Sequence, residues 1–154
     1  MNDSKTKLKG ILLIGIGNTG RNDDGLGWQF ADIAAETLAA KMDIEYRYQL
    51  QVEDAELVSQ YKTVFFADAS VTKLPQGFEI KQCHPAAHYM YSSHAQTPET
   101  VLYLAKELYH HVPVAYTIAV EGNNWDMGTS LSKKAAKNLA KAVKAFKEKL
   151  ESLG

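Results

Sequence analysis

The stretch KGILLIGIGNTGRNDDGLG, residues 9–27, decides the fold because it joins a buried strand, a glycine turn and the start of a helix. Residues 9–16 are rich in isoleucine and leucine and close on glycine, which is typical of a strand buried in a parallel sheet. After the turn, Leu26, Phe30 and Ile33 recur at helical spacing and predict a helix over residues 25–40. The order strand, loop, helix is the opening unit of an α/β domain.

The alternation of strands and helices continues along the chain. We expect further strands over residues 44–50, 63–68 and 113–120, a short helix over 52–61, and a last amphipathic helix from Ser132 to about Leu150. Thr97 and Pro98 have the residue types of an N-cap and a first helical position, and predict a helix reaching about Tyr109.

Residues 78–82 have the pattern of a strand that is exposed on one face. Phe78, Ile80 and Gln82 alternate after a proline and a glycine, which predicts a half-exposed strand at a sheet edge, antiparallel to its neighbour. The pattern as a whole predicts a three-layer α/β/α sandwich with a mostly parallel sheet of about five strands, forming one domain over residues 1–154.

The composition limits the classes of partner. The chain has 154 residues, 45% of them hydrophobic, with 17 basic and 18 acidic side chains. A net charge near zero gives no overall field for nucleic acid or an anionic membrane, and no segment approaches the ~20 apolar residues that span a bilayer. The single cysteine, Cys83, excludes an internal disulfide, so we expect a cytoplasmic protein.

In such folds, ligands bind beyond the carboxyl ends of the strands. The loops there are residues 17–25, 68–77, 84–97 and 120–131, and each is richer in polar residues than a turn requires.

The glycine turn has the spacing of a dinucleotide-binding loop. Gly15, Gly17 and Gly20 satisfy G-x-G-x-x-G after a predicted strand. However, Asp23 and Asp24 lie where a pyrophosphate would approach, and two carboxylates would repel it unless a cation intervened. The two aspartates could instead cap the following helix and complement its dipole.

Two further residues give the aspartates a possible role. Asp68 follows the apolar run of the third strand, and His94 precedes the helix that Thr97 caps. Asp68 could merely form a turn, and a loop histidine can be incidental. If Asp24, Asp68 and His94 meet at one sheet edge, two carboxylates and an imidazole suit nickel, zinc or iron.

Other candidate residues give weaker patterns. Cys83, His84 and His88 form C-H-x-x-x-H, which would need one more ligand for a zinc site. His110 and His111 fall at a helix C-terminus, where we expect them at the surface. The chain has no G-x-S-x-G motif, and no motif marks Cys83 as a nucleophile, so covalent proteolysis finds no support.

Several motifs resemble those of the hydrogenase maturation endopeptidases. They are LLIGIGNTGRNDDGLGWQFA (12–31), VFFADAS (64–70), SSHAQTPETVLYLAKEL (92–108) and, more loosely, TIAVEGNNWDMGTSLS (117–132). The resemblance implies an α/β/α sandwich and an endopeptidase that removes a C-terminal extension from a nickel-iron hydrogenase large-subunit precursor after nickel insertion. The metal-contacting residues of the family fall on Asp24, Asp68 and His94, and the metal would be the nickel of the precursor, another divalent cation being possible in vitro.

The sequence also departs from the family's pattern. Asp24 stands where the family typically has glutamate, and Val120, Glu121 and Gly122 replace a motif that usually ends in glutamate and proline. These changes leave two alternatives beside an active endopeptidase. One is a relative that binds metal or precursor without cutting, and the other is a nucleotide-binding α/β protein.

Overall fold

A computed structural model describes residues 7–89 and 96–153, which build a five-stranded sheet flanked by helices. The strands lie in the order β2-β1-β3-β5-β4, and every neighbouring pair is parallel except β5 and β4. Their bounds are β1 Lys9–Ile16, β2 Asp43–Arg47, β3 Tyr61–Ser70, β4 Phe78–Cys83 and β5 Val114–Glu121. The predicted mostly parallel sheet with an antiparallel edge strand is confirmed.

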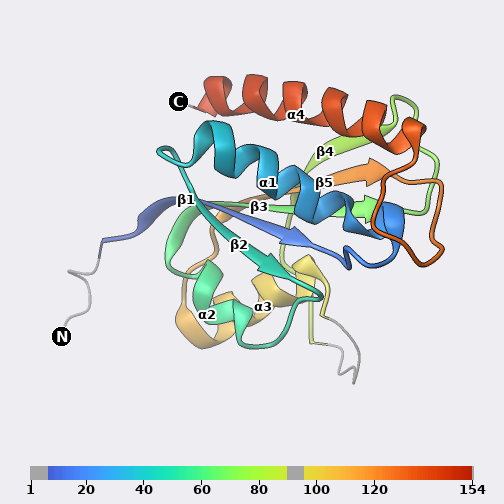
Figure 1. Cartoon of the computed structure of the whole chain (residues 1–154). Helices are drawn as coiled ribbons and strands as arrows, with labels where there is room; N and C mark the ends of the chain where they lie inside the picture. Colours follow the sequence, from blue (N-terminus) through green and yellow to red (C-terminus); the bar gives the residue numbers. More distant parts are fainter. Residues whose placement is uncertain (1–6, 90–95, 154) are drawn as a thin grey trace.

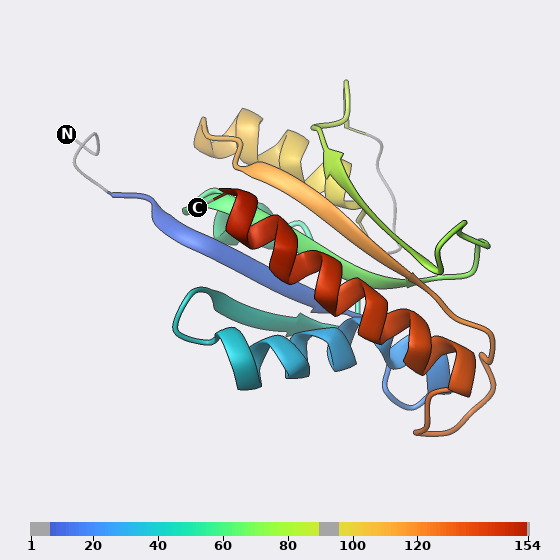
Figure 2. The same ribbon diagram turned by 90° about the horizontal axis from the view of Figure 1, so that it is seen from above.

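Helices cover both faces of the sheet. The pair α1 (Leu26–Leu38) and α4 (Lys133–Leu153) lies on one face, and the pair α2 (Asp54–Val58) and α3 (Pro98–Tyr109) lies on the other (Figures 1 and 2). No helix within the described ranges is long and apolar enough to cross a membrane. The predicted three-layer sandwich is therefore confirmed.

The apolar run of β1 is continuous because both of its faces are buried. Leu13 packs in the core beneath α1 and α4, whereas Leu12 and Ile14 pack in the core beneath α2 and α3. On the first face, the rings of Phe65 and Phe146 meet edge to face with centroids 4.9 Å apart. Aromatic pairs favour this geometry, which fixes α4 against the centre of the sheet.

The bounds of three strands differ from the prediction, and β5 does so by one residue at each end. β2 ends at Arg47 rather than residue 50, because its partner strand among the described residues, β1, ends at Ile16, which pairs with Arg47. β3 continues to Ser70 rather than Asp68, because β5 runs alongside and pairs Ser70 with Glu121. Asp68 therefore lies inside a strand, opposite Ala119, and not in a turn. The short helix α2 also covers less than the predicted 52–61.

Candidate functional site

The glycine turn brings the chain very close to the sheet. Gly17 has φ +145°, and a side chain there would collide with the backbone carbonyl of Asp24. The Gly17 amide donates to the Arg47 carbonyl at 3.0 Å, and the Asn18 amide donates to the Asp24 carbonyl at 3.0 Å. These contacts fix the short 3₁₀ helix η2 (Asn22–Gly25), which carries Asp24 at the carboxyl edge of the sheet.

Asp24 is half-buried, and its environment favours the protonated carboxyl. Burial raises the pKa of Asp24, although a hydrogen bond from the Asn18 amide and the positive charge of Arg21 act in the opposite direction. Arg21 is itself fixed by the loop that follows β5, because its Nη2 donates to the Trp125 carbonyl at 3.2 Å.

Asp68 has the more strongly perturbed carboxyl group. Burial raises its pKa to about 7, the Ala69 amide lowers it by donating to Oδ1 at 2.8 Å, and the negative charge of Asp24 raises it further. The residue is nevertheless exposed to water. The carboxyl thus lies in an open recess, where protein surrounds most of the group and solvent reaches it from one side.

Asp24 and Asp68 line the same recess, which has a volume of about 280 Å³. The remaining lining residues come from the ends of β1 and β2 and the start of α3: Ile16, Gly17, Tyr48, Gln49, Leu50, Gln96 and Pro98. A more apolar recess of about 340 Å³ adjoins it and shares Ile16, Asp68 and Pro98. Asp24 and Asp68 therefore lie together at the carboxyl edge of the sheet, while the roles expected of them stay predictions.

The third predicted ligand, His94, lies outside the described residues. The chain resumes at Gln96, whose amide donates to the Leu50 carbonyl at 3.1 Å. Thr97 caps α3 as predicted, since its hydroxyl oxygen accepts from the Thr100 amide at 3.1 Å. The helix that follows His94 in the sequence thus begins at the recess, while the role of His94 stays a prediction.

Asp23, next to Asp24, has a structural role that the sequence did not reveal. Its side chain is fully buried and accepts hydrogen bonds from the amides of Asn123, Asn124 and Ser132 and from the Ser132 hydroxyl, at 2.7–2.9 Å. Burial alone would raise the pKa of Asp23, but these bonds lower it below its usual value. Asp23 does not cap α1, which has no side-chain cap.

We call residues 20–23 together with 122–132 the latch. Its two segments also pair through the backbone, since the Asn22 amide donates to the Gly128 carbonyl and the Gly128 amide to the Gly20 carbonyl. Gly122 lies beneath Asp23, where an added Cβ would come 2.8 Å from the Asp23 Cβ. The latch holds η2 from behind and so fixes the direction in which Asp24 projects.

Glu121, the preserved acid of the fourth motif, is likewise structural. It is 6% exposed, and its Oε1 accepts from the Leu74 amide at 2.7 Å. This bond ties the end of β5 to the loop between β3 and β4, beside the latch. Glu121 therefore supports the loops around the recess without lining it.

Sequence reasoning missed the aromatic side of the recess. Tyr48 is 68% exposed, and its ring stacks on Trp28 with centroids 5.4 Å apart. The Trp28 indole N–H donates to the Arg47 carbonyl at 2.9 Å, and this bond fixes the ring on which Tyr48 stacks. Its position in the sequence could have indicated that Tyr48 lines the recess, because residues 48–50 directly follow a strand at the carboxyl edge of the sheet.

Other predicted metal ligands do not gather in the structure. Within the described ranges, no group of three or more His, Cys, Asp or Glu side chains is placed to hold a metal ion. Cys83 is buried, and burial together with the nearby Glu99 carboxylate raises the pKa of its thiol to about 12. His110 is exposed as expected, but His111 is half-buried and its Nε2 lies 2.9 Å from the Tyr61 carbonyl.

The geometry also disfavours a nucleotide at the glycine turn. The space that a side chain of Gly15 or Gly17 would need is filled by backbone atoms of Gly27 and Asp24. The two glycines therefore permit close packing of the protein backbone, and they do not open a site for a phosphate. The adjacent recess is lined by two carboxylates. Such a recess attracts a cation or a hydrogen-bond donor, and repels a pyrophosphate.

Comparison with known proteins identifies the fold. No protein-family profile and no curated protein matches the sequence. Among solved structures, the hydrogenase maturating endopeptidase HybD from E. coli superposes with a TM-score of 0.72 at 17% identity, covering 94% of this chain and 93% of that one. The maturation protease HycI from Thermococcus kodakarensis gives 0.68 at 20% identity, covering 97% and 95%.

A hydrogenase 2 maturation peptidase from a Thaumarchaeota archaeon gives a TM-score of 0.66 at 19% identity, covering 95% of this chain and 99% of that one. At these identities the likeness establishes the fold, and it extends over nearly the full length of both chains in each comparison. This chain therefore has the fold of the hydrogenase maturation endopeptidases.

Proposed function

We propose that this protein is an endopeptidase that removes the C-terminal extension of a nickel-iron hydrogenase large-subunit precursor after nickel has been inserted. The observation that carries the proposal is the shared recess of Asp24 and Asp68, at the carboxyl edge of a fold otherwise found in named maturation endopeptidases. The resemblance of the sequence motifs selects the same two residues.

The donor set suits a metal that arrives with the substrate. Two carboxylates leave most positions of a divalent ion free for the precursor's own ligands, and His94 would add an imidazole. In this proposal Asp24 and Asp68 contact the nickel of the loaded precursor. A precursor without nickel would leave the two carboxylates facing each other with no cation between them, so it would bind less tightly.

The nickel of the loaded precursor would supply the chemistry of cleavage. Held by Asp24 and Asp68, it would polarise the scissile carbonyl or lower the pKa of an attacking water. The pKa of Asp68 is raised to about 7 without a cation, and a divalent cation in contact with its carboxylate would lower it again, so that both aspartates would be ionised as ligands.

The experiment is a mass measurement on a hydrogenase precursor, loaded with nickel or free of it, after mixing with this protein. We expect loss of a short C-terminal peptide only from the loaded precursor. Asp24→Ala, Asp68→Asn and His94→Ala should each abolish the loss. Glu36→Ala is a matched control, because Glu36 is exposed on α1 and does not line the recess.

Two outcomes would contradict the proposal in different ways. A stable complex with an unchanged precursor mass would favour the non-cleaving relative, to which the shorter carboxylate of Asp24 could contribute. A precursor that is neither bound nor cut, together with saturable nucleotide binding, would assign the recess to another function.

A further inference from the structure

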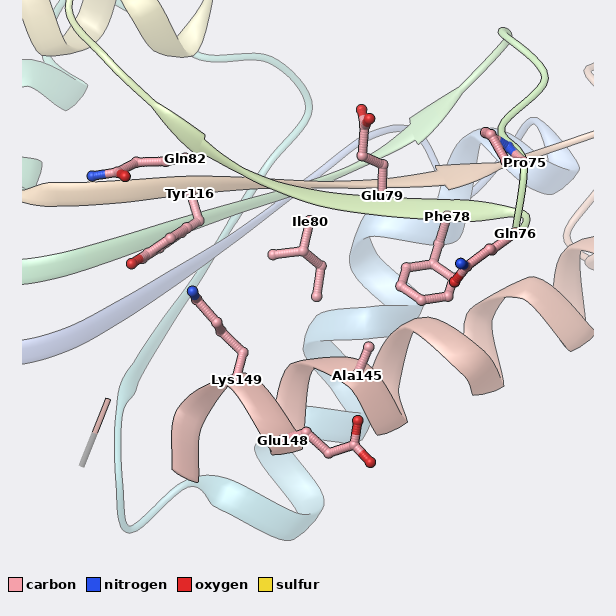
Figure 3. A pocket seen from close by; sticks show the side chains of 10 residues that line it. All are labelled: Pro75, Gln76, Phe78, Glu79, Ile80, Gln82, Tyr116, Ala145, Glu148 and Lys149. Carbon is pink, nitrogen blue, oxygen red and sulfur yellow. The ribbon is translucent and has the colours of Figure 1, made fainter. Parts of the chain in front are cut away.

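A recess of about 680 Å³ lies away from the acidic pair, between β4 and α4 (Figure 3). Phe78 and Ile80 point from β4 toward α4, whereas Glu79 points away from it. Tyr116 and Lys149 close one end, with the Lys149 ammonium 4.6 Å from the centre of the Tyr116 ring. This recess runs alongside the edge strand of the sheet, so any occupant of the edge would also cover it.

The outer edge of β4 has backbone groups directed away from the sheet. The Glu121 amide donates to the Gly77 carbonyl at 2.9 Å, and the register pairs Phe78 with Val120. Because backbone groups alternate sides along a strand, Glu79 and Lys81 bond toward β5, whereas Phe78, Ile80 and Gln82 direct their N–H and C=O groups outward. Within the described ranges, no backbone hydrogen bond joins these outward groups to another segment.

We propose that two copies of this chain associate by antiparallel pairing of β4 with β4, with Ile80 on the two-fold axis. In that register Ile80 faces Ile80 of the second copy, and Phe78 faces Gln82, so the outward backbone groups of both strands pair with each other. Glu79 then faces Lys81 of the second copy, and the symmetry repeats this opposite-charge pair. The inference does not rest on the proposed function.

The charges select this register over its neighbours. A two-fold axis one residue earlier would set Glu79 against Glu79, and one residue later it would set Lys81 against Lys81. Positions that are not hydrogen-bonded across an antiparallel pair bring their side chains closest, so like charges there repel strongly. Glu79 and Lys81 occupy such positions, and both are exposed. The sequence of the strand is therefore complementary to itself at one register.

The pairing would also cover apolar side chains that α4 leaves partly exposed. Phe78 and Ile80 pack against the core beneath α4, yet both are only half-buried and line the recess beside the strand. The second copy of β4 would lie along the edge of that recess. Long unpaired edges with apolar side chains promote non-specific association, and a charge-matched symmetric pairing replaces it with one defined contact.

The test is a charge swap read out as molar mass by sedimentation equilibrium over a range of protein concentrations. We expect the unmodified chain to dimerise, and both Glu79→Lys and Lys81→Glu to raise the dimer dissociation constant by at least about tenfold. The double variant Glu79→Lys with Lys81→Glu restores opposite pairs at the axis and should recover dimerisation. Lys62→Glu changes the net charge equally on another strand and should leave the dimer unchanged.

Three outcomes would overturn the proposal. The first is a chain that stays monomeric at concentrations up to about 100 μM. The second is a dimer that survives both single reversals, and the third is a double variant that stays monomeric while circular dichroism shows it folded. A monomer whose β4 amides become protected from exchange by an added extended peptide would assign the edge to a different partner.

Discussion

Asp23 and Asp24 are neighbours in the chain, yet the latch and the recess place them in opposite environments. Asp23 is fully buried and accepts four hydrogen bonds, which lower the pKa of its carboxyl below the usual value. Asp24 is less buried and lines a recess together with Asp68, and the pKa values of both carboxyls are raised. The supply of hydrogen-bond donors, and not burial alone, therefore decides which carboxylate is structural.

The environments of Asp23 and Asp24 also differ in their effect on the stability of the fold. A buried carboxylate with several amide donors stabilises the fold, whereas two facing carboxylates oppose it. The latch thus helps to offset the cost of holding Asp24 and Asp68 together. The following four changes test this division, from the largest expected effect on stability to the smallest.

Replacing Asp23 by alanine should lower the free energy of unfolding by about 3–5 kcal/mol, because three amides and a hydroxyl lose their fully buried acceptor. Urea denaturation followed by circular dichroism measures the change. Asp24→Ala is the matched control and should cost less than about 1 kcal/mol. Equal effects of the two variants would contradict the distinction between latch and recess.

Replacing Gly27 by alanine should cost about 2–3 kcal/mol, because the new Cβ would meet backbone atoms at the ends of two strands. It would lie 2.5 Å from the Ala67 carbonyl oxygen and would also collide with the Ile16 carbonyl. Gly10→Ala serves as the control, since a Cβ at Gly10 meets nothing within 4 Å. Thermal unfolding of both variants would show whether the helix must lie this close to the sheet.

Replacing Asp68 by asparagine should flatten the dependence of stability on pH. The pKa of Asp68 is raised from 3.8 to about 7, so between these values the folded state binds more protons than the unfolded state, and the stability from the protonated group is lost as pH rises through about 7. The effect should stay below about 1 kcal/mol because water reaches the group. Urea titrations at several pH values from acid to neutral test it, and an unchanged slope in the variant would contradict the raised pKa.

Replacing Asp24 by glutamate should have the smallest effect on folding, within about 0.5 kcal/mol, because the recess is open and the latch is untouched. The variant places at this position the glutamate that the resemblance to the maturation endopeptidases implies. Comparing its cleavage of a loaded precursor with that of the unmodified chain shows what the missing methylene does. A large loss of stability would mean that the recess has no room for the longer side chain.

Much of the fold was predictable because hydrophobic periodicity reports burial directly. The apolar run of β1 indicated a strand buried on both faces, and Thr97 with Pro98 marked the start of α3 correctly. Strand ends were less predictable, since they depend on where a partner strand stops. β2 ends with β1, and β3 continues because β5 accompanies it.

The common location of two site candidates was predictable. Asp24 follows β1 and Asp68 lies near the carboxyl end of the parallel strand β3, so topology alone brings them to one edge. The role of Asp23 could not be seen, because its partners lie 100–109 residues away in the sequence. Tyr48 was overlooked because an exposed tyrosine after a strand carries no periodic signal.

The latch also has a consequence for the order in which this protein matures on the ribosome. Its first segment is made early, but its second segment ends at Ser132, and α4 follows. Contacts of such long range form late, because the intervening chain must be closed first. The turn that carries Asp24 therefore cannot be locked until the partners of Asp23, 100–109 residues later in the sequence, have been synthesised, so the acidic recess is completed late.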